Sequence, residues 1–352
     1  MLRRVPAFVR SVTPRHRRWL AIEYFALFLI SQPLRGLATP ADRTDTPGPE
    51  ASAPLPAFDQ LWNFRDPAAT EAAFAEILPL AESADNRSYR LELLTQIARA
   101  QGLQARFVDA HETLDRVESA LTGDLPRARV RYLLERGRAH NAIPGGPGPS
   151  PEQRRKLAAP LFEAAFQLAQ VEGLDAYALD AAHMMGIVEP ADTALAWSFR
   201  AIEIAEASQN PEARGWLGPL YNNTGWTLFK AARYEEALDL FVKCEVFHRT
   251  SKAGSSPHLI ARWSVAKAQR VLGRVEVALR EQESLRDTRT AAGEPSGYVF
   301  EELGECLLAL DRARDAAPWF ARAHEVLSQD VWLAENEPER LSRLEELGQG
   351  DR

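Results

Sequence analysis

The chain has 352 residues, of which 45% are hydrophobic and 26% are charged, and its formal net charge is −7. Positive charge gathers at the start, where residues 1–38 hold seven Arg against one Glu, a local +6 that leaves −13 for the remainder. Binding to a phosphate backbone needs a basic face, so we expect no nucleic-acid partner for this acidic body.

Residues 1–38 have the outline of a signal peptide. An Arg-rich start leads to the apolar run WLAIEYFALFLI at 19–30 and then to Gly36-Leu37-Ala38, which fits a cleavage site. However, Glu23 interrupts the run, and about twelve apolar residues fall short of the roughly twenty that a spanning helix needs. We expect a non-structural leader on a cytoplasmic protein. Export to the periplasm, or membrane attachment through residues 1–38, is the alternative.

Residues 39–56 are rich in Pro, Ala, Thr and Asp, with almost no large apolar side chain, which predicts a disordered linker. Order is expected from residue 57. Asp66 and Pro67 are an N-cap residue and a first helical residue, and they predict a helix over 68–81 that caps the domain.

From residue 94 onward, small residues recur at a fixed interval on predicted helices. In five units the small residue of a first helix precedes that of a second helix by twelve positions: Ala98/Ala110, Ala182/Ala194, Gly225/Ala237, Ala266/Ala278 and Gly304/Ala316. Small residues at both positions indicate two antiparallel helices in close contact. Each hairpin leaves an apolar stripe that it cannot bury alone, so the hairpins are expected to stack.

A sixth unit separates its small residues, Gly137 and Ala158, by 21 positions. The nine additional residues fall in the Pro- and Gly-rich stretch 142–151, where the helical pattern must break. We interpret the insertion as a tolerated surface loop. A lid over a binding groove is the alternative.

The central unit carries the most specific motif. Tyr221, Thr224, Gly225 and Leu228 follow the W-x2-L-G-x2-Y spacing of a tetratricopeptide repeat, and Ala237 and Phe241 follow its A-x3-F spacing. Residues 57–347 therefore resemble the tetratricopeptide repeat family. The resemblance implies an all-α, right-handed superhelical solenoid of about six antiparallel hairpins with capping helices. The last helix is expected over 338–347, and residues 348–352 form a fraying tail.

The chain shows no sign of catalytic chemistry. It contains no H-E-x-x-H, G-x-S-x-G or G-x-x-x-x-G-K-[ST] motif, and its seven His pair with no Cys at metal-ligand spacing. Cys244 and Cys306 fall on helix faces of separate units and are expected to be buried small residues rather than a disulfide. We therefore expect no enzyme activity, no cofactor and no metal.

The resemblance places the binding surface on the concave face, where residues beside the small position of each first helix point. By unit these are Gln96 and Arg99; Glu135 and Arg138; Asp180 and His183; Asn222, Asn223 and Trp226; Trp263, Lys267 and Arg270; and Glu301, Glu302 and Glu305. The set is polarised, with cations in earlier units and three glutamates in the last. The favoured partner-binding residues are Arg99, Arg138, His183, Asn222, Asn223, Trp226, Trp263, Lys267 and Arg270.

Asn223 and Lys267 resemble part of the carboxylate clamp with which some members of the family hold a peptide C-terminus, although the other positions of the clamp are not all present. For Trp226 and Trp263, packing between repeats is the alternative to a partner contact. The leading hypothesis is a non-catalytic scaffold or adaptor that binds a peptide or protein in this groove. A regulator that responds to a ligand or peptide and acts on a partner in trans is the alternative. The sequence does not indicate an oligomeric state.

Overall fold

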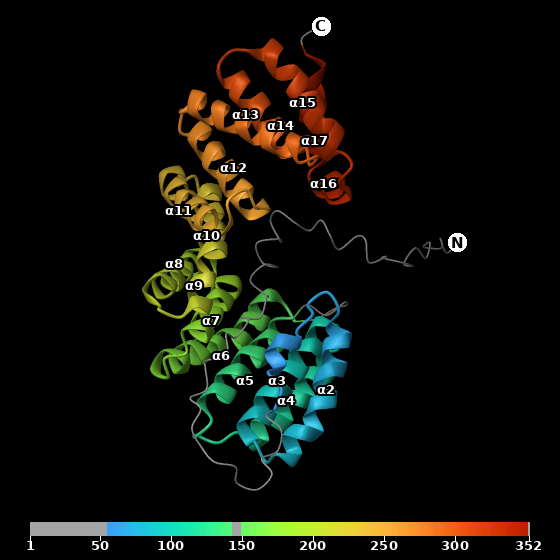
Figure 1. Ribbon diagram of the computed structural model, residues 1–352, viewed down its shortest axis with the longest axis vertical. Helices are drawn as coiled ribbons and strands as arrows, with labels where there is room; N and C mark the ends of the chain where they lie inside the picture. The colour runs from blue at the N-terminus through green and yellow to red at the C-terminus, as the bar shows by residue number, and fades with distance from the viewer. Residues whose placement is uncertain (1–54, 143–148, 351–352) are drawn as a thin grey trace, which may run out of the picture. The chain divides into compact units, whose positions relative to one another are not determined.

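The computed structural model describes residues 55–142 and 149–350. Helices account for the ordered structure in these ranges, which contain no strand, so the predicted all-α class is confirmed (Figure 1). The predicted leader at 1–38, most of the linker at 39–56 and most of the insertion at 142–151 lie outside the described residues. The described chain divides into two compact units, with the boundary between Thr224 and Gly225.

The unit that ends at Thr224 begins with a short 3-10 helix and a single capping helix, followed by three helix pairs. Its elements are η2 (Phe58–Leu61), α2 (Pro67–Ser83), α3 (Arg87–Leu103) with α4 (Phe107–Ala120), α5 (Pro126–Asn141) with α6 (Pro151–Val171), α7 (Asp175–Val188) with α8 (Ala191–Ala207), the short α9 (Pro211–Gly215) and the start of α10 (Leu217–Lys230). Helices that follow one another from α2 to α8 pack together, as the hairpin pattern predicts (Figure 1).

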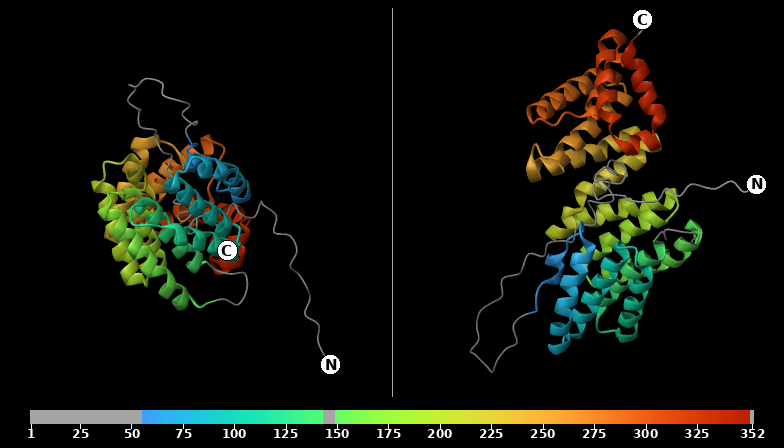
Figure 2. Two further views of the ribbon diagram at one scale, coloured as in Figure 1. Left: turned by 90° about the horizontal axis from the view of Figure 1, so that it is seen from below. Right: turned by 90° about the vertical axis from the view of Figure 1, so that its right-hand side faces the viewer.

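The unit that begins at Gly225 contains the rest of α10 and seven further helices. These are α11 (Tyr234–Lys252), α12 (Ser256–Val271), α13 (Val275–Ala291), α14 (Gly297–Ala309), α15 (Ala313–Leu327), α16 (Val331–Asn336) and α17 (Pro338–Gln349). The last helix extends two residues beyond the predicted 338–347 and packs on α15. The sequence analysis did not predict the short helices α9 and α16. The two further views in Figure 2 show the same succession of helix pairs within each unit.

The turns inside the helix pairs follow one rule. In four pairs the residue seven positions after the small residue of the first helix has a positive φ: Ala105 (60°), Ala232 (58°), Gly273 (79°) and Asp311 (57°). The next N–H then donates back to the first helix, as from Arg233 N to Leu228 O at 3.0 Å. This left-handed cap ends the first helix abruptly and turns the chain into an antiparallel second helix.

The start of α2 confirms the predicted cap at Asp66, and the structure shows a further cap at the start of α6. The Asp66 side chain accepts a hydrogen bond from Ala69 N at 3.0 Å, and Pro67 is the first residue of α2. After the insertion, Ser150 and Gln153 form a reciprocal capping box that begins α6. Helix α5 ends at Asn141, where the Pro- and Gly-rich stretch begins, and α6 begins at Pro151.

Where the small residue of the first helix is Gly, it lies directly against a Phe ring of the second helix. A Cβ placed on Gly225 would lie 2.6 Å from Phe241 Cε1, and one on Gly137 would lie 2.5 Å from Phe162 Cε1. Gly304 faces Phe320 in the same way, at 2.8 Å. Where the first helix has Ala, the second has a residue other than Phe at this position: Leu114, Ser198 or Gln282. Each hairpin therefore matches a Gly to a Phe or an Ala to a smaller or non-aromatic partner.

Both cysteines, Cys244 and Cys306, are buried and form no disulfide, which confirms the prediction of small buried residues. Burial raises the pKa of the Cys306 thiol to about 12, so it stays protonated and unreactive at neutral pH. Within the described ranges, no helix combines the length and apolar character that crossing a membrane requires.

Gln282 departs from the apolar character of the second helices. It occupies in α13 the position that Phe241 occupies in α11, and its side chain is fully buried. Among the described residues, neither its amide nitrogen nor its amide oxygen has a hydrogen-bond partner. A buried amide without partners costs about 1–3 kcal/mol.

We predict that the pairing of Gly225 with Phe241 appears as a coupling free energy. Gly225→Ala should destabilise the wild-type chain, because the new methyl group overlaps the buried ring. The free-energy cost of this overlap exceeds the gain from the higher helix propensity of Ala. In a Phe241→Leu background the same change should stabilise, since Ala with Leu is the combination found at Ala98 and Leu114. Denaturant unfolding of the four proteins should give a coupling of about 1–3 kcal/mol. Additive effects would contradict this account of the hairpin.

We predict that Gln282→Met increases stability by about 1–2 kcal/mol, because methionine keeps the unbranched shape and removes the unpaired amide. Thermal or urea unfolding measures the change. Gln282→Glu is the matched control and should destabilise, since it places a carboxylate in the same apolar position. A loss of stability in the Met variant would mean that the amide has a partner in solution, such as a bound water.

Candidate functional site

The candidate site is the face of the first helices that carries the polar residues selected from the sequence. In the unit ending at Thr224 we define the N-terminal row as Arg99 on α3, Glu135 and Arg138 on α5, and Asp180 and His183 on α7. In the unit beginning at Gly225 we define the C-terminal row as Lys267 and Arg270 on α12 with Glu301, Glu302 and Glu305 on α14. The two rows are described separately.

Ion pairs between successive first helices connect the N-terminal row. Arg99 donates from one guanidinium nitrogen to both oxygens of Glu135, at 3.2 and 3.3 Å. Arg138 donates to Glu135 at 2.7 Å and, through its other nitrogen, to Asp180. Glu135 is 6% exposed, so two arginines surround a buried carboxylate. The structure therefore brings together four predicted groove residues, but as partners of one another.

Electrostatics in this row favour the charged forms of the pair between α5 and α7. Burial alone would raise the pKa of Asp180, but the positive charges of Arg138 and Arg99 outweigh it and lower that pKa. Burial likewise opposes the charge of Arg138, while Asp180 and Glu135 raise its pKa. For Arg99, burial and the like charge of Arg138 lower the pKa.

His183 lies at the α7 end of the N-terminal row and is neutral at physiological pH. Burial lowers its pKa to about 4 and is the largest effect, because the negative charge of Asp180, which raises the pKa, and the positive charge of Arg138, which lowers it, both act more weakly. Its ring meets the Trp216 ring edge to face, with the centroids 5.9 Å apart. His183 is therefore a neutral hydrogen-bonding side chain with an aromatic neighbour rather than a cation.

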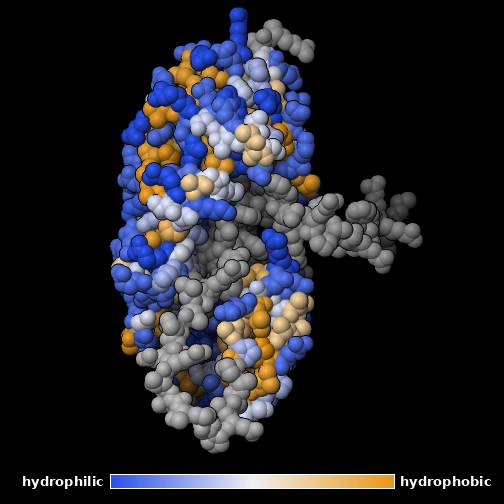
Figure 3. Space-filling view, viewed as in Figure 1, coloured by the Kyte–Doolittle hydropathy of each residue, from blue (hydrophilic) through white to orange (hydrophobic). Residues whose placement is uncertain are grey.

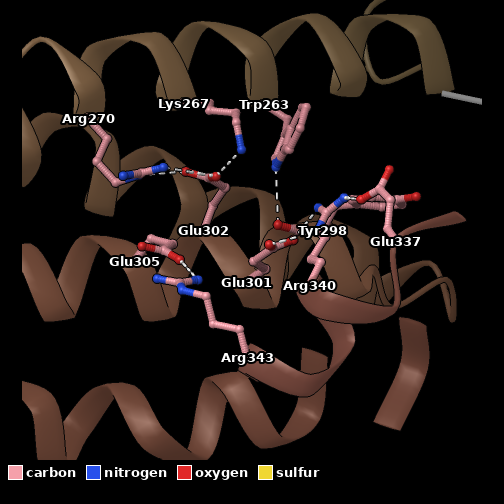
Figure 4. A network of polar contacts seen from close by, with 10 residues as sticks. All are labelled: Trp263, Lys267, Arg270, Tyr298, Glu301, Glu302, Glu305, Glu337, Arg340 and Arg343. Atoms are coloured by element: carbon pink, nitrogen blue, oxygen red, sulfur yellow. Dashed lines mark hydrogen bonds and ion pairs between the residues drawn. The ribbon is translucent and has the colours of Figure 1, made fainter. Parts of the chain in front are cut away.

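The C-terminal row is also internally paired (Figure 4). Glu302 is 1% exposed and accepts from Lys267 Nζ at 2.6 Å and from Arg270 Nε at 2.8 Å. The other two glutamates of α14 pair with α17: Glu301 with Arg340, and Glu305 with Arg343 at 2.5 Å. The sequence predicted cations in the earlier units and three glutamates in the last. In the structure all three glutamates form ion pairs with cations of the same compact unit.

The two tryptophans on this side of the C-terminal unit pack against each other, with ring centroids 5.7 Å apart. Trp263 is 9% exposed, and its indole N–H donates to Tyr298 O at 3.2 Å. Lys267 Nζ lies 5.2 Å from the Trp263 ring centroid. Packing between repeats, the alternative that the sequence left open, is the role that these contacts show for Trp263, while Trp226 is only half-buried.

Asn222 and Asn223 lie half-buried on α10 in the N-terminal unit, and Asn222 Nδ2 donates to Asn223 Oδ1 at 3.1 Å. For the predicted carboxylate clamp, the ammonium of Lys267 already pairs with Glu302. A peptide carboxylate would have to share that ammonium, so the clamp stays a prediction.

Sequence reasoning missed a second polar cluster about two turns earlier on the same helices. Arg131 on α5 forms a two-point ion pair with Asp59 of η2, at 3.1 and 2.6 Å, and lies 3.3 Å from Glu92 of α3. The Arg131 guanidinium also covers the rings of Phe58 and Tyr177, at 5.3 and 5.2 Å. The available signal was the seven-residue spacing that places Glu92 and Arg131 on the face of Arg99 and Arg138.

The ion pairs between successive first helices follow a simple register of sequence positions. The cations Arg99, Arg138 and Lys267 each follow the small residue of their helix by one position. Their carboxylate partners Glu135, Asp180 and Glu302 each precede the small residue of the next first helix by two. Two further pairs of successive first helices have uncharged residues in this register. Asn223 and Ser264 take the carboxylate position, and His183 and Trp226 take the corresponding cation position.

The described residues contain no group of three or more His, Cys, Asp and Glu side chains arranged to hold a metal ion. No protein-family model matches the chain, and the comparison with curated proteins also finds no match. Similar solved structures include BtubC (BKLC) from P. vanneervenii, with 13% identity over 78% of this chain and 92% of that chain and a TM-score of 0.38. A tetratricopeptide repeat protein from Parabacteroides merdae has 15% identity over 81% and 93%, with a TM-score of 0.39. Similarity at these TM-scores does not support a functional assignment, and the fold is defined by the helix pairs described above.

We predict that Glu302→Gln destabilises the protein by about 1–3 kcal/mol near neutral pH, because two charged donors lose their buried acceptor. Burial alone would raise the pKa of Glu302, but Lys267 and Arg270 lower it below the ordinary 4.5. The carboxylate therefore contributes stability above pH 4.5, and this contribution is lost as pH falls through the lowered pKa.

The measurement is urea unfolding of wild type and variant across the acidic range. The difference between them should shrink as pH falls below 4.5. Glu305→Gln, one turn further along α14 and more exposed, is the control and should give a smaller difference. A difference that does not change with pH would show that the lost ion pairs are not the cause.

Proposed function

We propose that this chain is a non-catalytic scaffold. It binds a peptide or protein on the faces of its first helices that carry the N-terminal row and the C-terminal row. The observation that carries the proposal is the ladder of ion pairs between successive first helices. It holds partly exposed guanidinium and ammonium groups in fixed positions, with Arg99 15%, Arg138 19% and Lys267 20% exposed.

Fixed polar groups suit the recognition of an extended chain. Each cation keeps N–H donors beyond those used by its carboxylate, because guanidinium has five and ammonium has three. Since the side chains are already ordered by their ion pairs, a partner orders few further rotamers when it binds. His183 in the N-terminal row, and Trp226 in the unit of the C-terminal row, add amphipathic surface of the kind enriched at interfaces.

The balance of charge favours a protein partner over a nucleic acid. Each row sets its cations against carboxylates, so neither presents the uncompensated basic stripe that phosphate binding needs. On the face shown in Figure 3, hydrophobic residues lie in small groups between hydrophilic ones. A partner held along the two rows would rely on hydrogen bonds to their charged side chains and on single aromatic contacts.

We predict that partners captured from native cell extract by the full chain are lost when the rows are altered. Lys267→Gln changes the C-terminal row and leaves Arg270 to hold Glu302, while His183→Asn changes the N-terminal row without changing charge at neutral pH. At least one of these should reduce capture about tenfold or more, which corresponds to about 1.4 kcal/mol of binding free energy. Quantitative mass spectrometry of the bound fraction is the measurement.

Matched controls come from the second helices. Lys156→Gln removes the same charge from α6, where the side chain is 66% exposed, and His324→Asn makes the same exchange on α15. Both should capture partners as wild type does. If the controls lose the partner and the row variants keep it, binding occurs on the second helices and the proposal fails.

A further inference from the structure

The chain's own residues 57–64 lie on the face that the sequence assigns to a partner. Trp62 Nε1 donates to Gln96 Oε1 at 3.2 Å, and the Phe64 ring lies 5.8 Å from the guanidinium of Arg99. Both Gln96 and Arg99 belong to the predicted groove. We call residues 57–64 the strap.

The strap enters the second polar cluster with an acidic side chain. Asp59, 36% exposed, forms its two-point contact with Arg131, which is itself 8% exposed. Phe58 beside it packs edge to face on Tyr89 and under the Arg131 guanidinium. Arg131 has another carboxylate, Glu92, at 3.3 Å, so its charge is compensated in part without the strap.

The aromatic end of the strap is more exposed than Phe58, although the Trp62 ring packs edge to face on the buried Phe74 with the centroids 5.4 Å apart. Trp62 and Phe64 stack on each other with ring centroids 4.6 Å apart, and both are only half-buried. Asn63 N donates to Thr70 Oγ1 at 3.0 Å, which connects the strap to α2. On the other side, Pro56 O accepts a hydrogen bond from the Tyr89 hydroxyl at 2.7 Å, and Phe58 is 5% exposed, so these two residues hold that end of the strap.

From these contacts we infer that the strap is an internal ligand that occupies a binding site on α3 and α5. A partner peptide that carries an acidic residue between aromatic residues binds in its place. The inference rests on the proposed function and names the chemistry of its partner. Arg131 recognises the acid by a two-point contact, Gln96 accepts from an indole N–H, and Arg99 covers an aromatic ring.

Tethering explains how the strap would keep the site closed. A segment joined directly to α2 has an effective concentration on the order of millimolar at its own site. A free peptide of the same sequence therefore competes poorly in wild type. Weakening the tethered copy should open the site to the free one.

The test uses the full chain and a fluorescent synthetic peptide with the sequence of residues 55–66, LPAFDQLWNFRD. Binding is followed by fluorescence anisotropy. The strap variant Asp59→Ala/Trp62→Ala should bind the peptide about tenfold or more tightly than wild type. A peptide carrying Asp59→Ala should not bind, because it lacks the acceptor for Arg131.

Gln60→Ala/Leu61→Ala is the matched control, since both side chains lie in the same segment and are exposed. It should behave as wild type. Circular dichroism and thermal unfolding establish that each variant is folded, and Asp59→Asn, which keeps the side-chain shape, provides a milder strap variant.

Two results would overturn the inference. If folded strap variants bind the peptide no better than wild type, residues 57–64 are a permanent part of the core. If wild type and control bind it as tightly as the strap variant, the peptide binds elsewhere. Either result leaves the scaffold proposal standing, because that proposal is tested separately through Lys267 and His183.

Discussion

The close approach of two helices at a single small residue sets the geometry of each repeat. Where Gly137, Gly225 or Gly304 stands, the Phe ring of the second helix occupies the space that a Cβ would need. This contact fixes how far the helices are displaced along one another. In four of the helix pairs the residue seven positions after the small residue turns the chain back. Residues one after and two before the small residue form the ion pairs between successive first helices.

The ion-pair ladder follows from that register. Because stacked hairpins place equivalent faces side by side, a cation one position after the small residue meets a carboxylate two positions before the next. A buried carboxylate such as Glu302 is tolerated only because two cations surround it. Within each compact unit, successive helix pairs are therefore matched by charge as well as by shape. The uncharged residues at His183 and Trp226 mark the places where the chain uses aromatic contacts instead.

In the proposed function the surfaces that stabilise the stacked helices also contact the partner. Charges that hold successive helices together are partly exposed and already ordered, so they can contact a partner without being freed from their ion pairs. The strap illustrates such a contact within the molecule, because Asp59 shares Arg131 with Glu92. Its mixture of acid and aromatic side chains shows what this face accommodates.

The sequence alone determined the all-α class, the six helix pairs in the described residues, the cap at Asp66 and the buried state of both cysteines. Those features depend on local periodicity and on the identity of single residues, which a sequence displays directly. Only the tertiary structure decided that Arg99, Arg138, Lys267 and Arg270 are ion-paired, that Trp263 packs between repeats and that Asp59 reaches Arg131. The contacts among these that connect different elements join residues 32 to 72 positions apart, and their existence depends on which helix faces meet. Helical spacing indicates that a side chain lies on a face, whereas its partner is set by the helix stacked against it.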